Sequence, residues 1–196
     1  DTDRSRGLGD VYKRQQLHQP ITDALALKGI SMIAENLEKA YENGEDREAR
    51  RNMMIASTIG GMAFISSNVG AVHAFAETVG AWFDTPHGVA NSLFLPYIME
   101  FNIPACPERF ADIADAMGIE REESMSDEQY ALKAVEYVKA LNRKLNIPTI
   151  KEIKGITEER FEAIAERSAN NVLSNDNARK ITKEDYLELL KKAYNE

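Results

Sequence analysis

Apolar residues recur at steps of three and four along most of this 196-residue chain, and this period constrains the fold more than any other feature. In the segment ITDALALKGISMIAENLEKAYENG, which starts at Ile21, the helical spacing persists until Asn43 and Gly44. Such spacing puts apolar side chains on one face of a helix, and Asn-Gly favours the left-handed backbone that ends one. No alternation of apolar and polar residues is long enough to predict a strand. We therefore expect an all-α fold, a bundle of several helices.

A second, very apolar segment begins after Asp46, and glycines interrupt it at Gly60, Gly61 and Gly70. Small residues let another helix approach closely, although each glycine costs about 1 kcal/mol of helix stability relative to alanine. The pattern fits either one buried central helix or a broken pair of helices. After it, Thr85 and the proline that follows predict the N-cap and first residue of a further helix.

The last ninety or so residues predict further helices with caps of their own. Ser126 with Gln129 three residues later has the form of a capping box, and Thr182 with Asp185 resembles one. Between the last two predicted helices, NVLSNDNARK forms a polar loop.

Composition excludes several classes of protein. The chain carries 24 Lys and Arg against 32 Asp and Glu, a net charge of −8, which argues against a nucleic-acid-binding surface. No apolar run approaches the roughly 18 residues that span a bilayer, and no signal peptide is visible, so we expect a soluble cytoplasmic protein without membrane contact. The single cysteine, Cys106, cannot form an internal disulfide, and we interpret it as a partly buried structural side chain.

Two of the three histidines lie close together in the sequence, in VHAFAETVGAWFDTPHGVAN. His73 falls within a helical pattern, and His87 falls fourteen residues later in the first turn of the next predicted helix. Neutral imidazoles from two such helices could share a divalent first-row metal. Because a catalytic metal usually takes three or more protein ligands, spacing alone leaves open that these are hydrogen-bonded structural histidines.

Glu77 lies four residues after His73 and so on the same helical face. Its carboxylate could serve the site as a ligand, a hydrogen-bond acceptor for a ligand or a proton acceptor, or it could simply be solvated or paired with an arginine. Packing and capping account for the nearby Phe83, Asp84 and Phe94, to which we assign no chemistry.

The stretch GAVHAFAETVGAWFDTPHGVANSLFLPYIMEFN closely resembles the metal-binding signature of the iron-containing alcohol dehydrogenases. The resemblance extends over roughly residues 20–196. It implies the helical C-terminal domain of the dehydroquinate synthase-like fold that these enzymes share. Family members resemble two-domain proteins with an N-terminal dinucleotide-binding domain, and this chain is similar to the second domain only.

By this resemblance the metal, usually Fe²⁺ and sometimes Zn²⁺, has one aspartate and three histidines as ligands, of which His73 and His87 are two. The family takes the other two from an Asp-x-x-x-His helix that has no counterpart in this sequence, and His18 is not assigned to that role. Glu77 stands where many relatives have a histidine that helps proton transfer, so it is the candidate catalytic residue. No dinucleotide fingerprint is present, and we predict no cofactor-binding residue in this chain.

Residues 1–16 have few apolar side chains and no helical period, so we expect a foreign or disordered leader before a helical metal-binding domain at 17–196. The resemblance then implies a fragment of a longer enzyme that is inactive by itself.

The full-length relative would interconvert alcohols with aldehydes or ketones, using NAD(P) and a divalent metal that polarises the substrate oxygen. We expect it to act on a small-molecule alcohol or aldehyde and to form a homo-oligomer. Two alternatives stay open: a non-catalytic helical interaction or dimerisation module, and the domain of a glycerol dehydrogenase-like metalloenzyme.

Overall fold

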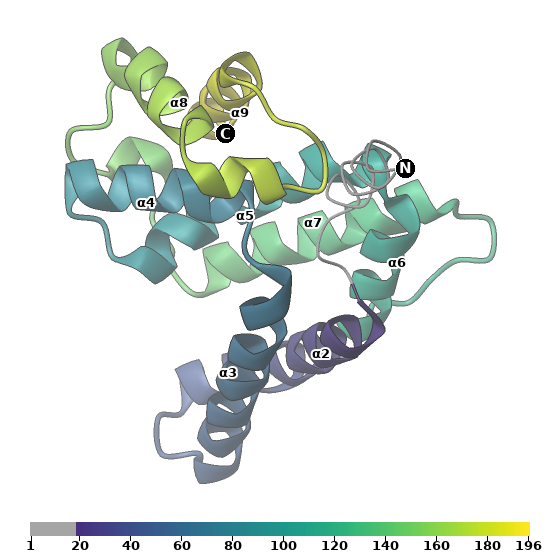
Figure 1. Cartoon of the computed structure of the whole chain (residues 1–196). Helices are drawn as coiled ribbons and strands as arrows, with labels where there is room; N and C mark the ends of the chain where they lie inside the picture. The colour runs from purple at the N-terminus through teal and green to yellow at the C-terminus, as the bar shows by residue number, and fades with distance from the viewer. Residues whose placement is uncertain (1–18) are drawn as a thin grey trace. The chain divides into compact units, whose positions relative to one another are not determined.

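A computed structural model describes residues 19–196, which form eight α-helices, four 3-10 turns and no strand (Figure 1). The α-helices are α2 (Pro20–Glu42), α3 (Arg47–Ser67), α4 (Ala71–Phe83), α5 (His87–Asn102), α6 (Pro107–Ala116), α7 (Asp127–Lys144), α8 (Phe161–Ala169) and α9 (Lys183–Asn195). The 3-10 turns are η1 (Ile103–Ala105), η2 (Ile150–Glu152), η3 (Glu158–Arg160) and η4 (Val172–Asp176). The all-α prediction is confirmed for this part of the chain. The predicted leader, residues 1–16, and His18 lie outside the described residues.

The described residues divide into two compact units. The first comprises 19–68 and 106–134, and the second comprises 69–105 and 135–196, so α7 contributes to both. Within residues 19–196, no helix combines the length and the apolar character that crossing a membrane would need.

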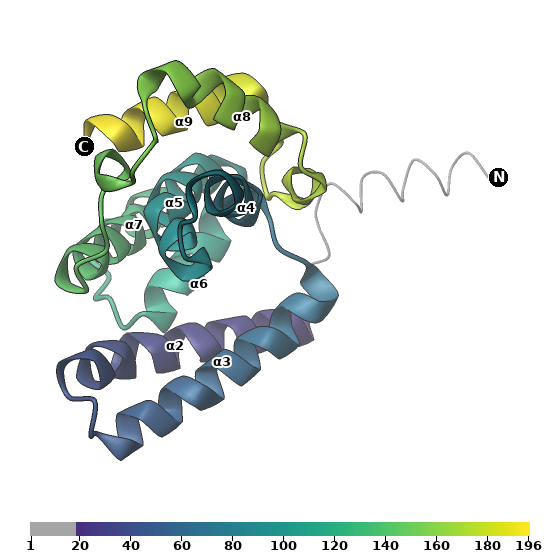
Figure 2. The same cartoon turned by 90° about the vertical axis from the view of Figure 1, so that its left-hand side faces the viewer.

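In the first unit, α2 and α3 lie side by side as a helical hairpin (Figures 1 and 2). Gly29 lies at their contact, where a Cβ would come within 3.6 Å of the Ile59 side chain. Helix α3 runs unbroken through Gly60 and Gly61, so those glycines do not interrupt it. The break comes instead after Ser67, and of the two interpretations the broken pair agrees with the structure.

The second unit contains the core that positions the histidines. Helices α4, α5, α8 and α9 supply most of its buried apolar side chains, and α8 and α9 lie side by side in both views (Figures 1 and 2). Its largest fully buried aromatic side chains are Phe75, Phe94 and Tyr186. Burial of such rings contributes strongly to folding, because each removes a large apolar area from water.

Helix ends test the predictions about caps. Ser126 and Gln129 exchange hydrogen bonds of 3.2 and 3.0 Å, which confirms the predicted capping box. The prediction for Thr85 is wrong, because Pro86 is the N-cap of α5, the helix starts at His87 and the Thr85 hydroxyl has no partner. The proline fixes its own φ near −53°, and the helix follows it without a side-chain cap.

Two smaller predictions also meet the structure. Helix α2 ends at Glu42 as expected, but Asn43 is extended with φ −133°, so the left-handed ending predicted there is wrong. Cys106 is partly buried as predicted. Burial raises the pKa of its thiol, against a smaller opposing effect of Arg109, so the side chain is a poor nucleophile.

Candidate metal centre

Helix α4 has a polar edge beside its buried face. Phe75, Thr78 and Val79 are almost completely buried, whereas His73 is half-buried and Glu77 is exposed. Residues four apart lie one above the other on a helix, so His73 and Glu77 share this accessible edge. His73 lies in the first turn of α4.

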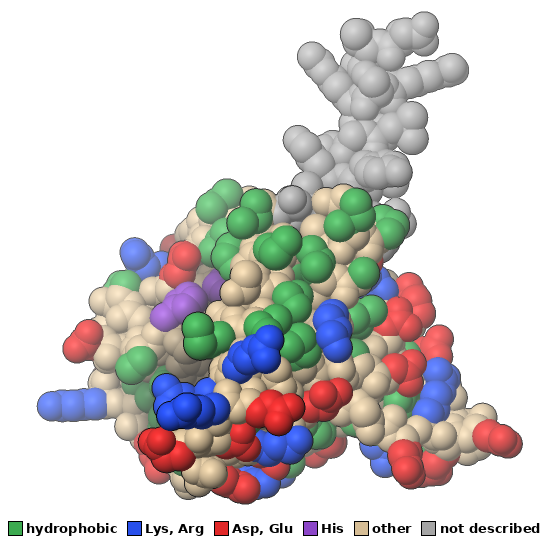
Figure 3. All heavy atoms as spheres, turned by 90° about the horizontal axis from the view of Figure 1, so that it is seen from below, with side chains coloured by type: hydrophobic (Ala, Val, Ile, Leu, Met, Phe, Trp, Pro, Cys, Tyr) green, Lys and Arg blue, Asp and Glu red, His purple; other side chains and the backbone are tan. Residues whose placement is uncertain are grey.

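His87 is the first residue of α5 and is exposed. The imidazole rings of His73 and His87 have centroids 5.3 Å apart and planes tilted by 52°. Figure 3 shows imidazole atoms at the molecular surface, where an ion or a substrate could reach them. The two residues, here called the histidine pair, are therefore adjacent and accessible, as a shared metal site requires.

The electrostatic setting of His73 favours a neutral ring. Burial lowers the pKa of His73, the neighbouring His87 lowers it further, and Glu77 opposes the shift. His73 also lies in the first turn of α4, where the partial positive charge of the backbone disfavours an imidazolium ion. Only the neutral ring has a nitrogen lone pair with which to bind a metal.

Two buried polar atoms without partners belong to residues close to His87 in the sequence. Among the described residues, the buried side-chain atoms that lack a hydrogen bond are Thr85 Oγ1 and Asn91 Oδ1, two residues before and four residues after His87. The Asn91 amide nitrogen lies 3.0 Å from His87 Nε2 and donates to the His87 carbonyl oxygen at 2.9 Å. Unsatisfied buried polar atoms are uncommon, and an ion or water that completes the site is one ordinary explanation.

The donor set fits part of a metal centre. Imidazole nitrogen suits divalent iron and zinc, and two such ligands can share one ion. Across residues 19–196, no group of three or more His, Cys, Asp or Glu side chains is arranged to hold a metal. The described part of the chain thus offers two adjacent side chains that could act as ligands, about half of the usual coordination shell of such ions.

Glu77 is held at the edge of the site. Asn171 donates a hydrogen bond of 2.8 Å from Nδ2 to Glu77 Oε2, and its own Oδ1 accepts from the backbone N–H of Leu173 at 3.0 Å. Asn171 also lines a surface pocket of about 530 Å³, in which Arg167 lies over the Trp82 ring at 5.4 Å. The Glu77 carboxylate is therefore oriented by a residue far away in sequence.

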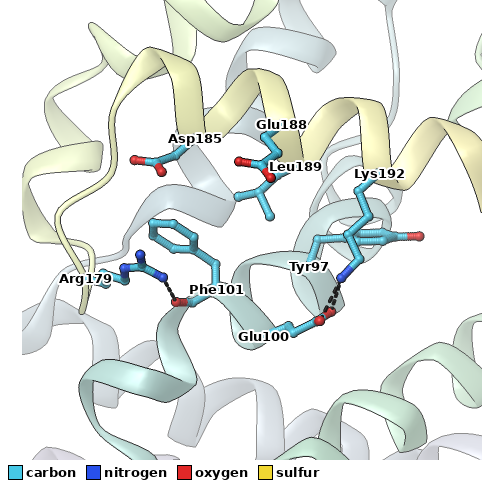
Figure 4. Close-up of a pocket in the computed structure, with 8 residues that line it drawn as sticks. All are labelled: Tyr97, Glu100, Phe101, Arg179, Asp185, Glu188, Leu189 and Lys192. Carbon is cyan, nitrogen blue, oxygen red and sulfur yellow. Dashed lines mark hydrogen bonds and ion pairs between the residues drawn. The ribbon is translucent and has the colours of Figure 1, made fainter.

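A separate pocket of about 330 Å³ lies between α5 and α9 (Figure 4). Its cations are already engaged: Lys192 pairs with Glu100 at 2.7 Å, and Arg179 donates to the Phe101 carbonyl oxygen at 3.1 Å and covers its ring. No histidine lines it, so it is distinct from the histidine pair.

Sequence reasoning selected the histidine pair and Glu77 but missed the asparagines that surround them. Asn91 follows His87 by one helical turn, so its position in PHGVAN was a usable signal. Asn171 and Asn177 belong to segments joining the last two helices, and their partners are about a hundred positions away, which no local pattern reveals.

The fold and the site together define a helical domain that presents two adjacent metal-type ligands. The family model described as "Fe-containing alcohol dehydrogenase family, C-terminal" matches residues 12–194 of this chain. The chain therefore belongs to this family. The predicted resemblance is thereby confirmed.

Curated relatives and solved structures agree with this assignment. The chain is 40% identical over 178 residues to alcohol dehydrogenase 4 of Saccharomyces cerevisiae, covering 89% of this chain and 44% of the relative. It is 38% identical over 175 residues to 1,3-propanediol dehydrogenase of Citrobacter freundii, covering 89% of this chain and 45% of that one. The chain thus spans somewhat less than half the length of the curated relatives it matches.

Among solved structures, an alcohol dehydrogenase from Oenococcus oeni superposes with a TM-score of 0.86 at 39% identity, over 90% of this chain and 46% of that one. A 1,3-propanediol oxidoreductase superposes with a TM-score of 0.85 at 37% identity, over 89% of this chain and 46% of that one. The helical arrangement described above is therefore one that iron-containing alcohol dehydrogenases also adopt.

Proposed function

We propose that His73 and His87 are two ligands of a catalytic divalent metal, Fe²⁺ or Zn²⁺, and that Glu77 accepts a proton beside it. The observation that carries this proposal is the 5.3 Å separation of the two imidazole rings in a chain of the iron-containing alcohol dehydrogenase family. Further support comes from the accessibility of the two imidazoles and from the unsatisfied Asn91 Oδ1 on the side chain whose amide nitrogen lies 3.0 Å from His87 Nε2.

When bound, such a metal would supply Lewis acidity to the oxygen of an alcohol or carbonyl substrate. The residues of this chain would provide the rest of the local chemistry. The histidine pair would fix the direction from which a substrate approaches the ion, because both imidazole rings project from the first turns of packed helices. The exposed carboxylate of Glu77, oriented by Asn171, would take up the alcohol proton.

We further propose that the chain supplies the helical half of an enzyme that interconverts alcohols and aldehydes or ketones with NAD(P). Support comes from relatives named as alcohol and 1,3-propanediol dehydrogenases, of which the chain covers 44% and 45%. The small-molecule substrate, the nicotinamide cofactor, the homo-oligomer and the cytoplasmic location are all proposals about the whole protein. We expect this chain by itself to be inactive, because the described residues offer only two metal ligands.

Calorimetric titration of the purified chain with Zn²⁺, and with Fe²⁺ under anaerobic conditions, tests the metal site. We expect one ion per chain, with binding abolished in His73→Ala/His87→Ala and weakened by on the order of 10- to 100-fold in Glu77→Gln if that carboxylate supports the ion. Unchanged binding in the double variant would contradict the proposal.

His18→Ala is the matched control for this titration, because it removes the third imidazole of the chain and leaves the histidine pair intact. We expect it to bind as the wild type does. Equal losses in His18→Ala and in the double variant would indicate nonspecific binding to imidazoles rather than a site at the pair.

A second candidate function, a helical interaction module, is favoured by one observation. Helix α3 exposes large apolar side chains, with Met54, Met62 and Ile65 exposed to 74%, 55% and 78%. Exposed apolar patches commonly mark interfaces. Sedimentation equilibrium separates the two functions: concentration-dependent association without metal binding at the histidine pair would favour the module.

A further inference from the structure

Helix α4, which carries His73 and Glu77, begins without a cap of its own. Its N-cap is Gly70, which has no side chain, and no side-chain hydrogen bond from that position satisfies the first turn. Ala71, the first residue of the helix, is fully buried, so its backbone N–H cannot be satisfied by water. The acceptor is Asn177 Oδ1 at 3.4 Å, from a residue 106 positions later in the chain.

Both polar atoms of the Asn177 side-chain amide form further hydrogen bonds. Its Oδ1 also accepts from Asn102 Nδ2 at 3.1 Å, and its Nδ2 donates to Asn102 Oδ1 at 2.7 Å and to the Arg179 carbonyl oxygen at 2.7 Å. Asn102 is the last residue of α5, the helix that His87 begins. Asn177 and Asn102 are only 5% and 7% exposed, so this reciprocal pair joins the start of one histidine-bearing helix to the end of the other.

The close approach of Asn177 explains the glycine at position 70. A Cβ on Gly70 would lie 3.2 Å from Asn177 Oδ1 and 3.3 Å from Asn177 Cα, tighter than ordinary contacts. Glycine here does not serve a left-handed turn, since its φ is −115°. It makes room for the asparagine that caps the helix from outside.

We infer that Asn177 is a positioning residue for the histidine pair, because it fixes the start of α4 two residues before His73 and ties it to α5. This inference rests on the proposed function, for which the pair must hold one ion. The requirement is specific: an oxygen must accept from the Ala71 N–H, and an N–H₂ group must donate to Asn102 and Arg179. An aspartate at position 177 keeps the acceptor oxygen but not the donor group, and a leucine of similar size keeps neither.

The test compares Asn177→Asp and Asn177→Leu in the full chain with two readouts, Zn²⁺ affinity and the NMR cross-peak between the two imidazole rings. We expect Asn177→Leu to lose the cross-peak and bind Zn²⁺ at least tenfold more weakly. Asn177→Asp keeps the acceptor for Ala71 but loses the donor to Asn102 and Arg179, so we expect it to weaken both readouts less than Asn177→Leu does. A residue that merely fills space would give the opposite order. Retention of both the cross-peak and the affinity in a folded Asn177→Leu chain would overturn the inference.

Two further variants keep the test decisive. Gly70→Ala leaves Asn177 intact but places a Cβ 3.2 Å from Asn177 Oδ1, so it should weaken the cross-peak and Zn²⁺ binding even if Asn177→Leu fails to fold. Wild-type values of both readouts in a chain whose Asn177 amide resonances have shifted would overturn the inference. Asn36→Leu is the matched control, because Asn36 is a comparably buried asparagine of the first unit, 6% exposed. It donates to the Met32 carbonyl oxygen and accepts from Asn52, also in the first unit. It should leave both readouts unchanged.

The two readouts also separate this inference from the proposed function. A wild-type chain that shows the cross-peak but binds no Zn²⁺ at the histidine pair would contradict the proposed function alone. In that case the cross-peak still decides whether Asn177 positions the rings.

Discussion

Helices α4 and α9 both belong to the second unit, but they begin in opposite ways. At α9, Thr182 accepts from the Asp185 N–H at 3.2 Å and Asp185 accepts from the Thr182 N–H at 2.8 Å, so four consecutive residues complete the cap. At α4, the cap comes from Asn177, more than a hundred residues away. Helix α9, which carries no residue of the candidate metal centre, is capped by its own sequence. Helix α4, which carries His73, depends on the tertiary fold for its cap.

This difference has a physical consequence. A local cap forms whenever its helix forms, while a distant one forms only when the loop before α9 is in place. The start of α4 is therefore coupled to the fold of the second unit, and the geometry of the histidine pair is coupled with it. Variants at the two caps should differ both in the size of their effect and in what they disturb.

The largest effect is expected for Asn177→Leu. It removes the hydrogen bonds that Asn177 makes with the buried Ala71 N–H and with both polar atoms of the Asn102 amide, so we expect a loss on the order of 3 kcal/mol in the free energy of unfolding. Urea denaturation followed by circular dichroism measures this loss. A loss below that of a surface cap would show that the distant cap does not stabilise α4.

Thr182→Ala should cost less, about 1 kcal/mol, because it removes one exposed N-cap from a helix that the core still holds. The same urea experiment gives the value, and the imidazole cross-peak gives the contrast. We expect the cross-peak between His73 and His87 to persist. Its disappearance would mean that the two helix starts are not independent.

The stability of the second unit should also depend on pH through the buried Tyr186. Burial raises the pKa of Tyr186 to about 12, against the opposing hydrogen bond with Ser174, while the unfolded chain has the ordinary value of 10.0. Between these values the unfolded state releases a proton that the folded state keeps, so stability falls as pH rises above about 10. Urea unfolding at pH 9 and pH 11 should show a smaller fall for Tyr186→Phe, and an identical fall would contradict this assignment.

The smallest effect is expected in the first unit. The ion pair between Arg109 and Asp23 spans 2.9 Å, but its side chains are 39% and 28% exposed. Such pairs contribute about 0.5 kcal/mol, so Arg109→Ala should shift the urea midpoint slightly and leave metal binding unchanged. A change in Zn²⁺ affinity would show that the first unit influences the histidine pair.

The predictable part of the molecule was the part governed by short-range patterns. Helical periodicity predicted the all-α class, the capping boxes at Ser126 and Thr182 were recognisable within four residues, and PHGVAN marked the histidine pair. The prediction for Thr85 failed because proline itself supplied the backbone angle before α5. Asn177 could not be predicted, because its role depends on a contact across 106 positions that only the folded chain creates.

X-ray absorption at the zinc K edge tests the central claim most directly, because it counts the imidazoles bound to the ion. On the chain loaded with one equivalent of Zn²⁺, our account predicts two imidazole ligands with Zn–N distances of about 2.0–2.1 Å, with oxygen completing the shell. His73→Ala/His87→Ala should show none. A wild-type spectrum without imidazole scattering, or one that the double variant reproduces, would contradict the claim that the histidine pair holds the metal.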